Sequence, residues 1–257
     1  MITPTETDRA VERPSRTWLD AALDLVFPAI CPVCGVALGA GRRDPLCGAC
    51  WTGLERITPP WCERCGLPFL SFAPSQTSTM KAGMCQGCAT DPPAFAWARS
   101  AAYYGDRARD AVHALKFRRK RALAKPLADL VGEQLARWLP DDIDALVPVP
   151  LSAIRERERG FNQSALLAER LGHRLDVPVR PRWLVRTRAT QPQTDLSAVE
   201  RRANVRHAFR ASPGVDGRHV VVVDDVFTTG ATVEECARAL AAAGARRVGV
   251  VTVARVV

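Results

Sequence analysis

Apolar residues in the second half of the chain form short β-branched runs that alternate with longer segments of helical spacing. The short runs predict buried strands at residues 97–104, 145–149, 220–223 and 248–253. The longer segments predict helices at residues 107–117, 122–139, 162–175 and 232–243, with Pro126 interrupting the second and Gly244 ending the last. The inner side of the third helix is expected to carry Ala165, Leu166, Leu167 and Leu171. This alternation is typical of an α/β domain with a parallel sheet, which we place at residues 97–257.

The N-terminal residues contain no apolar run long enough to cross a bilayer, which needs about 20 such residues. Residues 1–17 are polar and predict a disordered tail, while the apolar run at 18–30 is interrupted by Asp20 and Asp24. Its apolar positions predict one face of a docking helix, formed by Trp18, Leu19, Ala22, Leu23, Val26 and Phe27. A helix on a membrane surface is the alternative, but that class usually carries Lys and Arg on its polar face. Since no secretory signal is present either, we expect a cytoplasmic location.

Eight of the nine cysteines occur in pairs separated by two residues. The pairs are Cys31 and Cys34, Cys47 and Cys50, Cys62 and Cys65, and Cys85 and Cys88. Two residues between thiolates allow one tight turn to direct both sulfurs at one ion, and two such turns complete a tetrahedral zinc site with four cysteine ligands. A reducing cytosol argues against disulfides. We therefore predict two structural Zn²⁺ ions, each without an open position for catalysis.

The sequence leaves open which cysteine turns share an ion. Sequential pairing, which we favour, joins the first turn to the second and the third to the fourth, whereas a cross-braced arrangement would join the first to the third. Residues 69–83, rich in Ser, Thr and Pro, predict a loop within the second ribbon. This double zinc ribbon, with the docking helix before it, is predicted at residues 18–96. Cys236 lies alone in a predicted helix and is expected to be buried.

The net charge of +9 is concentrated in the second half of the chain. Residues 98–257 contain 28 Lys and Arg against 18 Asp and Glu, while residues 1–97 contain 8 against 9. A basic domain suits an anionic partner, which would be either a polyphosphate ligand or a nucleic acid. A solvated basic surface is the alternative interpretation.

The most informative segment, residues 220–232, is a strand followed by two acidic residues and a loop of small residues. Ligand sites in α/β folds lie at the carboxyl ends of strands, where Asp224 and Asp225 are expected. The loop leads directly into a helix, so its backbone amides can hold a phosphate. Hydroxyl donors are available from Thr228, Thr229 and Thr232. One short segment can therefore hold both the sugar and the phosphate of a ribose 5-phosphate.

This segment resembles the phosphoribosyl pyrophosphate (PRPP)-binding motif of type I phosphoribosyltransferases. The resemblance implies that Asp224 and Asp225 contact the ribose hydroxyls. It also implies a 5′-phosphate loop made of Thr228, Thr229, Gly230, Ala231 and Thr232. Residues 147–151 and 159–163, the segment 191–209, the tripeptide 115–117 and the four cysteine turns are similar to the ComF family, which includes ComFC-like and GntX-like proteins. The resemblance covers residues 18–255 and implies a type I phosphoribosyltransferase fold after a double zinc ribbon.

By position, the resemblance also implies a pyrophosphate loop at Pro148, Val149, Pro150 and Leu151, although Pro150 has no amide donor. The planar donors of Arg155, Arg157 and Arg159 suit pyrophosphate, or else form a solvated charged run. Mg²⁺ would neutralise the pyrophosphate. Residues 191–206 are interpreted as a mobile loop that covers the ligand, or as an ordinary surface hairpin or helix. The basic cluster of Lys116, Arg118, Arg119, Lys120 and Arg121 either binds nucleic acid or is simply exposed.

The resemblance to the ComF family implies a role in competence, in which single-stranded DNA is imported with the help of a helicase-like partner. Two classes of function stay open. One is a phosphoribosyltransferase acting on an unidentified nucleobase or amine. The other is a non-catalytic module that binds single-stranded DNA or senses a ligand.

Overall fold

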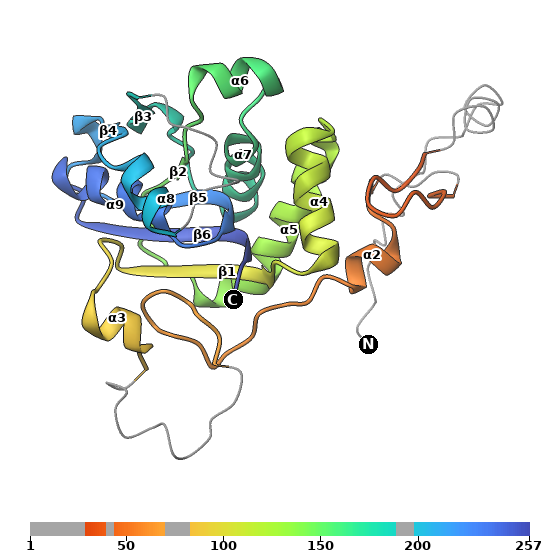
Figure 1. The fold of residues 1–257 in the computed structure, drawn as a ribbon, viewed down its shortest axis with the longest axis horizontal. Coiled ribbons are helices and arrows are strands. Elements are labelled where there is room, and N and C mark those ends of the chain that lie inside the picture. The colour runs from red at the N-terminus through yellow and green to blue at the C-terminus, as the bar shows by residue number, and fades with distance from the viewer. Residues whose placement is uncertain (1–28, 40–43, 70–82, 189–197) are drawn as a thin grey trace, which may run out of the picture.

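The β-branched runs form the sheet that organises the C-terminal domain. The structure is a computed structural model, which describes residues 29–39, 44–69, 83–188 and 198–257. In this part of the chain, four parallel strands lie in the order β1-β6-β5-β2 (Figure 1). Their bounds are β1 (Trp97–Tyr103), β2 (Ala145–Pro148), β5 (His219–Phe227) and β6 (Arg247–Arg255). The four predicted strands are confirmed, and β5 extends past the valines to include both acidic residues.

Helices cover both faces of this sheet because alternate valines of β5 point in opposite directions. Val221 and Val223 share a buried cluster with residues of α4 (Asp106–Phe117), α5 (Ala124–Leu135) and α7 (Gln163–Leu175). Val220 and Val222 share a second cluster with residues of α9 (Ala231–Ala242). Strand β5 is therefore buried on both faces, as its run of valines predicted.

The helix predicted at residues 122–139 is divided into three parts. A 3₁₀ turn (Arg121–Leu123) precedes α5, and another (Ala136–Trp138) follows it. Pro126 lies in the first turn of α5, where its missing N–H has no helical partner, so it does not break the helix. In α7, Leu167 and Leu171 are buried as predicted, whereas Ala165 and Leu166 are partly exposed and Ala168 takes the inner position.

Several short elements were not predicted. They are the antiparallel strands β3 (Leu184–Arg186) and β4 (Phe209–Ala211), the helix α6 (Ala153–Arg159), and 3₁₀ turns at Pro181–Trp183 and Pro213–Val215. Helix α8 (Ala198–Val205) lies in the segment 191–206, for which a surface hairpin or helix was the alternative prediction. The two strands have three residues each, too few to show an alternating pattern. Helix α6 has no fully buried residue, so its sequence lacks the apolar periodicity that marks a packed helix.

The N-terminal module is built around two short helices, α2 (Gly48–Thr52) and α3 (Gln86–Thr90). The predicted tail at 1–17, the docking helix as far as residue 28, and residues 70–82 of the predicted loop lie outside the described residues. The predicted domain limits stay predictions. No helix of the described part of the chain is long and apolar enough to cross a membrane.

Candidate functional site

Strand β5 brings the two predicted acidic residues to the carboxyl end of the parallel strands. The Oδ1 of Asp224 accepts hydrogen bonds from Ser164 Oγ at 2.8 Å and from the backbone N–H of Asp225 at 2.9 Å. Asp225 is 3% exposed, and its Oδ2 lies 2.9 Å from Lys116 Nζ in an ion pair. Both acidic residues line a cleft of about 740 Å³, a volume that includes space open to solvent.

The two carboxylates lie in surroundings that favour the neutral form of Asp224. Burial raises the pKa of Asp224, and the neighbouring charge of Asp225 raises it further, while Lys116 and the Ser164 hydroxyl act in the opposite direction. Hydrogen-bond donors on a ligand would stabilise the ionised form of Asp224. Vicinal sugar hydroxyls are donors of the appropriate size and charge.

The loop after β5 packs against the aromatic ring of Phe227. Gly230 has a φ of +78°, and a Cβ added there would lie 2.7 Å from Cζ of Phe227. Glycine is therefore required at this position, because a larger residue would be strained and would collide with the ring. Helix α9 begins at Ala231, so the positive end of its dipole and its first amides face the cleft.

The predicted loop residues differ in how they face the cleft. Those that line it are Thr228, Gly230, Ala231 and Thr232. Thr229 is not among the lining residues, and its Oγ1 accepts a hydrogen bond from the Ala231 amide at 3.4 Å. Thr229 thus shapes the turn from which the helix begins.

The opposite wall of the cleft follows strand β2. Val149, Pro150 and Leu151 line it, whereas Pro148 is buried within the strand and does not. Asn162 Nδ2 donates to the Val149 carbonyl at 3.0 Å and fixes the start of this wall.

The three arginines of helix α6 lie on different faces of the helix. Arg155 and Arg159 are four residues apart, and both line the cleft. Arg159 Nη1 donates to Gln163 Oε1 at 2.8 Å. Arg157 turns away, and its Nε donates to the carbonyl of Ala153 in its own helix at 3.2 Å.

Four residues that line the cleft or bond to its acidic pair were not predicted as site residues. They are Lys116, Gln163, Ser164 and Arg186. The sequence groups Lys116 with the basic cluster after α4, although its position between Leu115 and Phe117 is part of the family resemblance. Arg186 belongs to β3, a strand too short to be predicted. Gln163 and Ser164 are buried in the first turn of α7, where polar residues among apolar ones were the available signal.

Two arginines of the basic cluster make contacts within the protein. Arg119 Nη2 donates to the Glu158 carbonyl and Arg121 Nη2 to the Gly160 carbonyl, both at 2.6 Å. These bonds hold the end of α6 against the segment after α4. Arg119 and Arg121 therefore support the helix that carries Arg155 and Arg159.

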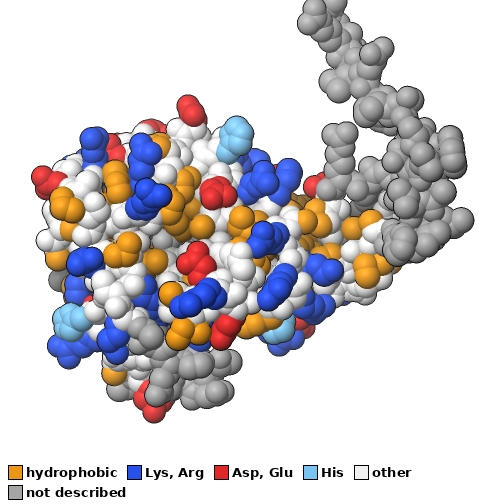
Figure 2. Space-filling model, turned by 90° about the horizontal axis from the view of Figure 1, so that it is seen from above, with side chains coloured by type: hydrophobic (Ala, Val, Ile, Leu, Met, Phe, Trp, Pro, Cys, Tyr) orange, Lys and Arg blue, Asp and Glu red, His pale blue; other side chains and the backbone are white. Residues whose placement is uncertain are grey.

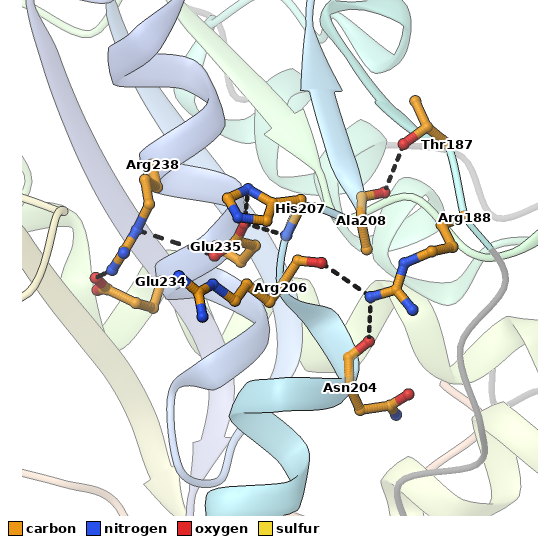
Figure 3. A network of polar contacts seen from close by, with 9 residues as sticks. All are labelled: Thr187, Arg188, Asn204, Arg206, His207, Ala208, Glu234, Glu235 and Arg238. Atoms are coloured by element: carbon orange, nitrogen blue, oxygen red, sulfur yellow. Dashed lines mark hydrogen bonds and ion pairs between the residues drawn. The ribbon is translucent and has the colours of Figure 1, made fainter.

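A network of polar contacts attaches the segment around β3 and β4 to α9 (Figure 3). The His207 amide donates to Glu235 Oε1 at 2.6 Å. Arg188 Nη2 donates to the carbonyls of Asn204 at 3.0 Å and Arg206 at 2.9 Å. This attachment holds β3, and with it Arg186, over the cleft. Of the predicted cover at 191–206, residues 198–205 form α8, while residues 191–197 lie outside the described residues.

The cleft has a basic rim around an acidic pair. Its lining contains Lys116, Arg155, Arg159 and Arg186 together with Asp224 and Asp225. Burial lowers the pKa of Arg159 and of Arg186, yet an arginine stays charged at neutral pH. In Figure 2, which views the molecule from above the orientation of Figure 1, Lys and Arg cover more of the surface than Asp and Glu. The site can therefore hold a ligand with several negative charges and sugar-like hydroxyls.

The eight paired cysteines form two groups of four. The groups are Cys31, Cys34, Cys47 and Cys50, and Cys62, Cys65, Cys85 and Cys88, so sequential pairing is confirmed. The sulfur of Cys34 lies 3.5 Å from that of Cys47, and Cys65 lies 3.7 Å from Cys85. A tetrahedral zinc ion with bonds of about 2.3 Å separates its sulfurs by about 3.8 Å, so both groups fit Zn²⁺. Cys236 is fully buried as predicted.

Comparison with known families agrees with this architecture. Residues 22–89 match a family model described as a double zinc ribbon domain. Residues 133–256 match a phosphoribosyl transferase domain. Fold, cleft and cysteine groups therefore define a double zinc ribbon joined to a domain with the type I phosphoribosyltransferase fold.

Sequence relatives place the chain more narrowly. It is 36% identical to the DNA utilization protein YhgH of Escherichia coli K12, over 88% of this chain and 96% of that protein. It is 28% identical to Competence protein F of Haemophilus influenzae, over 83% and 91% of the two chains. It is 29% identical to the competence protein ComFC of Bacillus subtilis, over 77% and 78%. The chain belongs to the ComF family.

One solved structure overlaps with about half of the chain. The glutamine PRPP amidotransferase of B. subtilis is 24% identical, with a TM-score of 0.36, over 51% of this chain and 26% of that one. The family assignment rests on the family models and the sequence relatives.

Proposed function

We propose that the cleft binds a PRPP-type ribose phosphate with Mg²⁺ in the cytoplasm, and that the protein supports DNA uptake. The observation that carries the proposal is the meeting of Asp224 and Asp225 with the start of α9 in one cleft. The carboxylates accept hydrogen bonds from the ribose hydroxyls. The amides at the start of α9, with the hydroxyls of Thr228 and Thr232, hold the 5′-phosphate.

The basic rim supports the pyrophosphate half of such a ligand. Arg155 and Arg159 on α6 and Arg186 on β3 all line the cleft. Their planar guanidinium groups offer paired donors that match phosphate oxygens. Mg²⁺ bound with the ligand would neutralise further charge on the pyrophosphate. Loss of pyrophosphate from C1 of ribose needs this positioning and charge stabilisation, and it needs no covalent nucleophile.

The names of the relatives support the biological half of the proposal. The E. coli relative is called a DNA utilization protein, and two other relatives are called competence proteins. Because identity with YhgH extends over 88% of this chain, we propose the same general role here, in contact with single-stranded DNA and a helicase-like partner.

Calorimetry with PRPP and Mg²⁺ tests the ligand. Asp225→Asn should weaken binding about tenfold to a hundredfold, because a charge-assisted hydrogen bond contributes roughly 1.5–3 kcal/mol. Asp106→Asn, at a side chain 89% exposed on α4, is the matched control and should bind as the parent does. Equal affinity of Asp225→Asn and parent would show that the site is assigned wrongly.

Genetics tests the role. In a transformable host, deletion of the gene should lower transformation by linear DNA and leave nucleotide prototrophy intact. An Asp224→Asn/Asp225→Asn double variant that accumulates to parental levels should not restore transformation. Full rescue by this variant would favour a scaffold with an unused pocket. Normal transformation in the deletion strain, with a purine or pyrimidine requirement, would favour a metabolic transferase.

A further inference from the structure

A buried arginine joins the second cysteine group to the sheet. Arg255 is the last residue of β6 and is 7% exposed. Its Nη1 donates to the carbonyl of Cys65 at 2.6 Å, and its Nη2 lies 3.8 Å from the Cys65 sulfur. The guanidinium also stacks on Phe227, with Cζ 4.3 Å from the ring centroid. One side chain thus contacts a zinc-ligand residue and the last residue of β5.

The stacked ring is the one that supports the proposed phosphate loop. Phe227 is 5% exposed, and its Cζ lies only 2.7 Å from the position that a Cβ on Gly230 would take. A shift of the ring would therefore release or displace the loop at the residue where α9 begins. Arg255, Phe227 and Gly230 form a continuous chain of contacts from the second cysteine group to the cleft.

A second contact joins the same two regions. The backbone N–H of Ala94, which lies between the second cysteine group and β1, donates to both carboxylate oxygens of Glu234 at 3.1 and 3.0 Å. Glu234 is in the first turn of α9. The next residue, Phe95, packs edge-on against Phe227 with 6.1 Å between ring centroids. The residues that follow the second ribbon thus hold the start of α9 from another side.

The first of these connections depends on the metal. Four thiolates around Zn²⁺ carry a net charge of about −2, which a nearby guanidinium offsets. Loss of the ion removes the bond that fixes the Cys65 turn, and with it the position of the carbonyl that accepts the hydrogen bond from Arg255. A buried guanidinium without its acceptor is unfavourable, so Arg255 would move out of its place on Phe227.

We infer that Arg255 is a positioning residue that couples the second zinc site, at Cys62, Cys65, Cys85 and Cys88, to the phosphate loop at residues 228–232. Zinc in that site holds the loop in its ligand-binding form. By linkage, a ligand in the loop stabilises zinc in that site by the same free energy. The ligand half of this inference rests on the proposed function, whereas the zinc-to-loop half does not.

The first cysteine group provides an internal control. Cys31, Cys47 and Cys50 share a buried cluster with residues of α4 on the other face of the sheet. On that side Arg118 Nη1 donates to the carbonyl of Pro32 at 3.2 Å, so it also joins a cysteine turn to the sheet domain. Arg118→Met therefore removes an exposed arginine-to-carbonyl bond from the first group, whereas Arg255→Met removes the proposed coupling.

The first experiment measures zinc release from the parent protein. A chelator is added with and without ribose 5-phosphate, and thiol alkylation followed by peptide mapping distinguishes the two groups. Ribose 5-phosphate should slow release from the Cys62 group about fivefold or more, the lower end of typical coupling, and leave the Cys31 group unchanged. Arg255→Met should lose this protection, Arg255→Lys should retain part of it, and Arg118→Met should retain all of it. Equal protection of both groups, or full protection in Arg255→Met, would overturn the inference.

The second experiment follows the loop without a ligand. Amide hydrogen exchange in the peptide that contains residues 227–232 should be faster in Arg255→Met than in the parent, and unchanged in Arg118→Met. Selective removal of zinc from the Cys62 group of the parent should produce the same increase. Unchanged exchange in both cases would refute the coupling. If calorimetry shows no ribose 5-phosphate binding to the parent, the proposed function fails, and exchange still decides the zinc-to-loop connection.

Discussion

The two cysteine groups share the two-residue spacing within each turn and have similar sulfur distances, but they have different neighbours. The first packs in one buried cluster with residues of α4 and α5. The second shares the other cluster with Phe227, Ala231 and Val233, at the start of α9. Spacing therefore determines how a metal is held, while the surrounding residues determine what the metal supports.

The glycines that follow one turn in each cysteine group also have different surroundings. Gly35 and Gly66 each follow a C-x-x-C turn directly, with φ of +75° and +71°. A Cβ on Gly35 would meet no atom within 4 Å, whereas one on Gly66 would collide with the Ala98 carbonyl oxygen in β1. The Cys62–Cys65 turn is therefore pressed against the edge strand of the sheet, and the Cys31–Cys34 turn has open space at the corresponding position.

The largest contrast is expected from removing one ligand of each ion. Cys31→Ser and Cys62→Ser should each reduce bound zinc from two ions to one, measured by metal analysis of protein purified without added zinc. Ribose 5-phosphate affinity should fall about fivefold or more in Cys62→Ser and change less than about twofold in Cys31→Ser. The sheet from β5 to β6 should remain folded in both. Equal losses of affinity would remove the distinction between the two groups.

A smaller contrast is expected from the paired glycines. Gly35→Ala should cost roughly 1–2 kcal/mol, because alanine is strained at positive φ. Gly66→Ala adds a steric clash with the backbone of β1, so it should cost roughly 1–3 kcal/mol more. Thermal unfolding of both variants, with zinc content verified, measures the difference. Similar melting temperatures of the two variants would mean that the Cys62–Cys65 turn is not pressed against β1 in solution.

The smallest effect concerns the cleft beside the second group. Since the pKa of Asp224 is raised above its usual value of 3.8, the folded protein binds more protons than the unfolded chain above about pH 4. The free energy of unfolding should then decrease as pH rises from there through the raised pKa. Asp224→Asn removes this penalty, so without ligand its melting temperature should exceed the parent's by about 2–4 °C at pH 8, for roughly 1 kcal/mol. At pH 4 the gain should vanish, and a gain independent of pH would exclude this cause.

Much of this arrangement could be predicted from the sequence because it depends on local patterns. The valines of β5 and the helix after Gly230 follow from periodicity and turn chemistry, and the cysteine spacing implies closed metal sites. Asp224 and Asp225 could be placed at the edge of the sheet because their strand was evident. The phosphate loop could be proposed before its geometry was known.

The parts that escaped prediction depend on contacts between distant segments. Lys116 reaches Asp225 across 109 positions of the chain, and neither composition nor periodicity shows that its side chain faces an acidic residue so far away. Arg186 is carried by a three-residue strand that exists because it pairs with β4. Arg255 contacts Cys65 from the far end of the sequence. Which arginines face the cleft and which support it is decided by tertiary packing.

The most direct test of the account is a crystal structure of the protein with PRPP and Mg²⁺. The 5′-phosphate should lie within hydrogen-bond distance, about 2.7–3.2 Å, of backbone amides at the start of α9. The ribose hydroxyls should contact Asp224 and Asp225, with Arg255 still stacked on Phe227. A ligand bound elsewhere, or held in this cleft without contact to the acidic pair and the loop, would contradict the account.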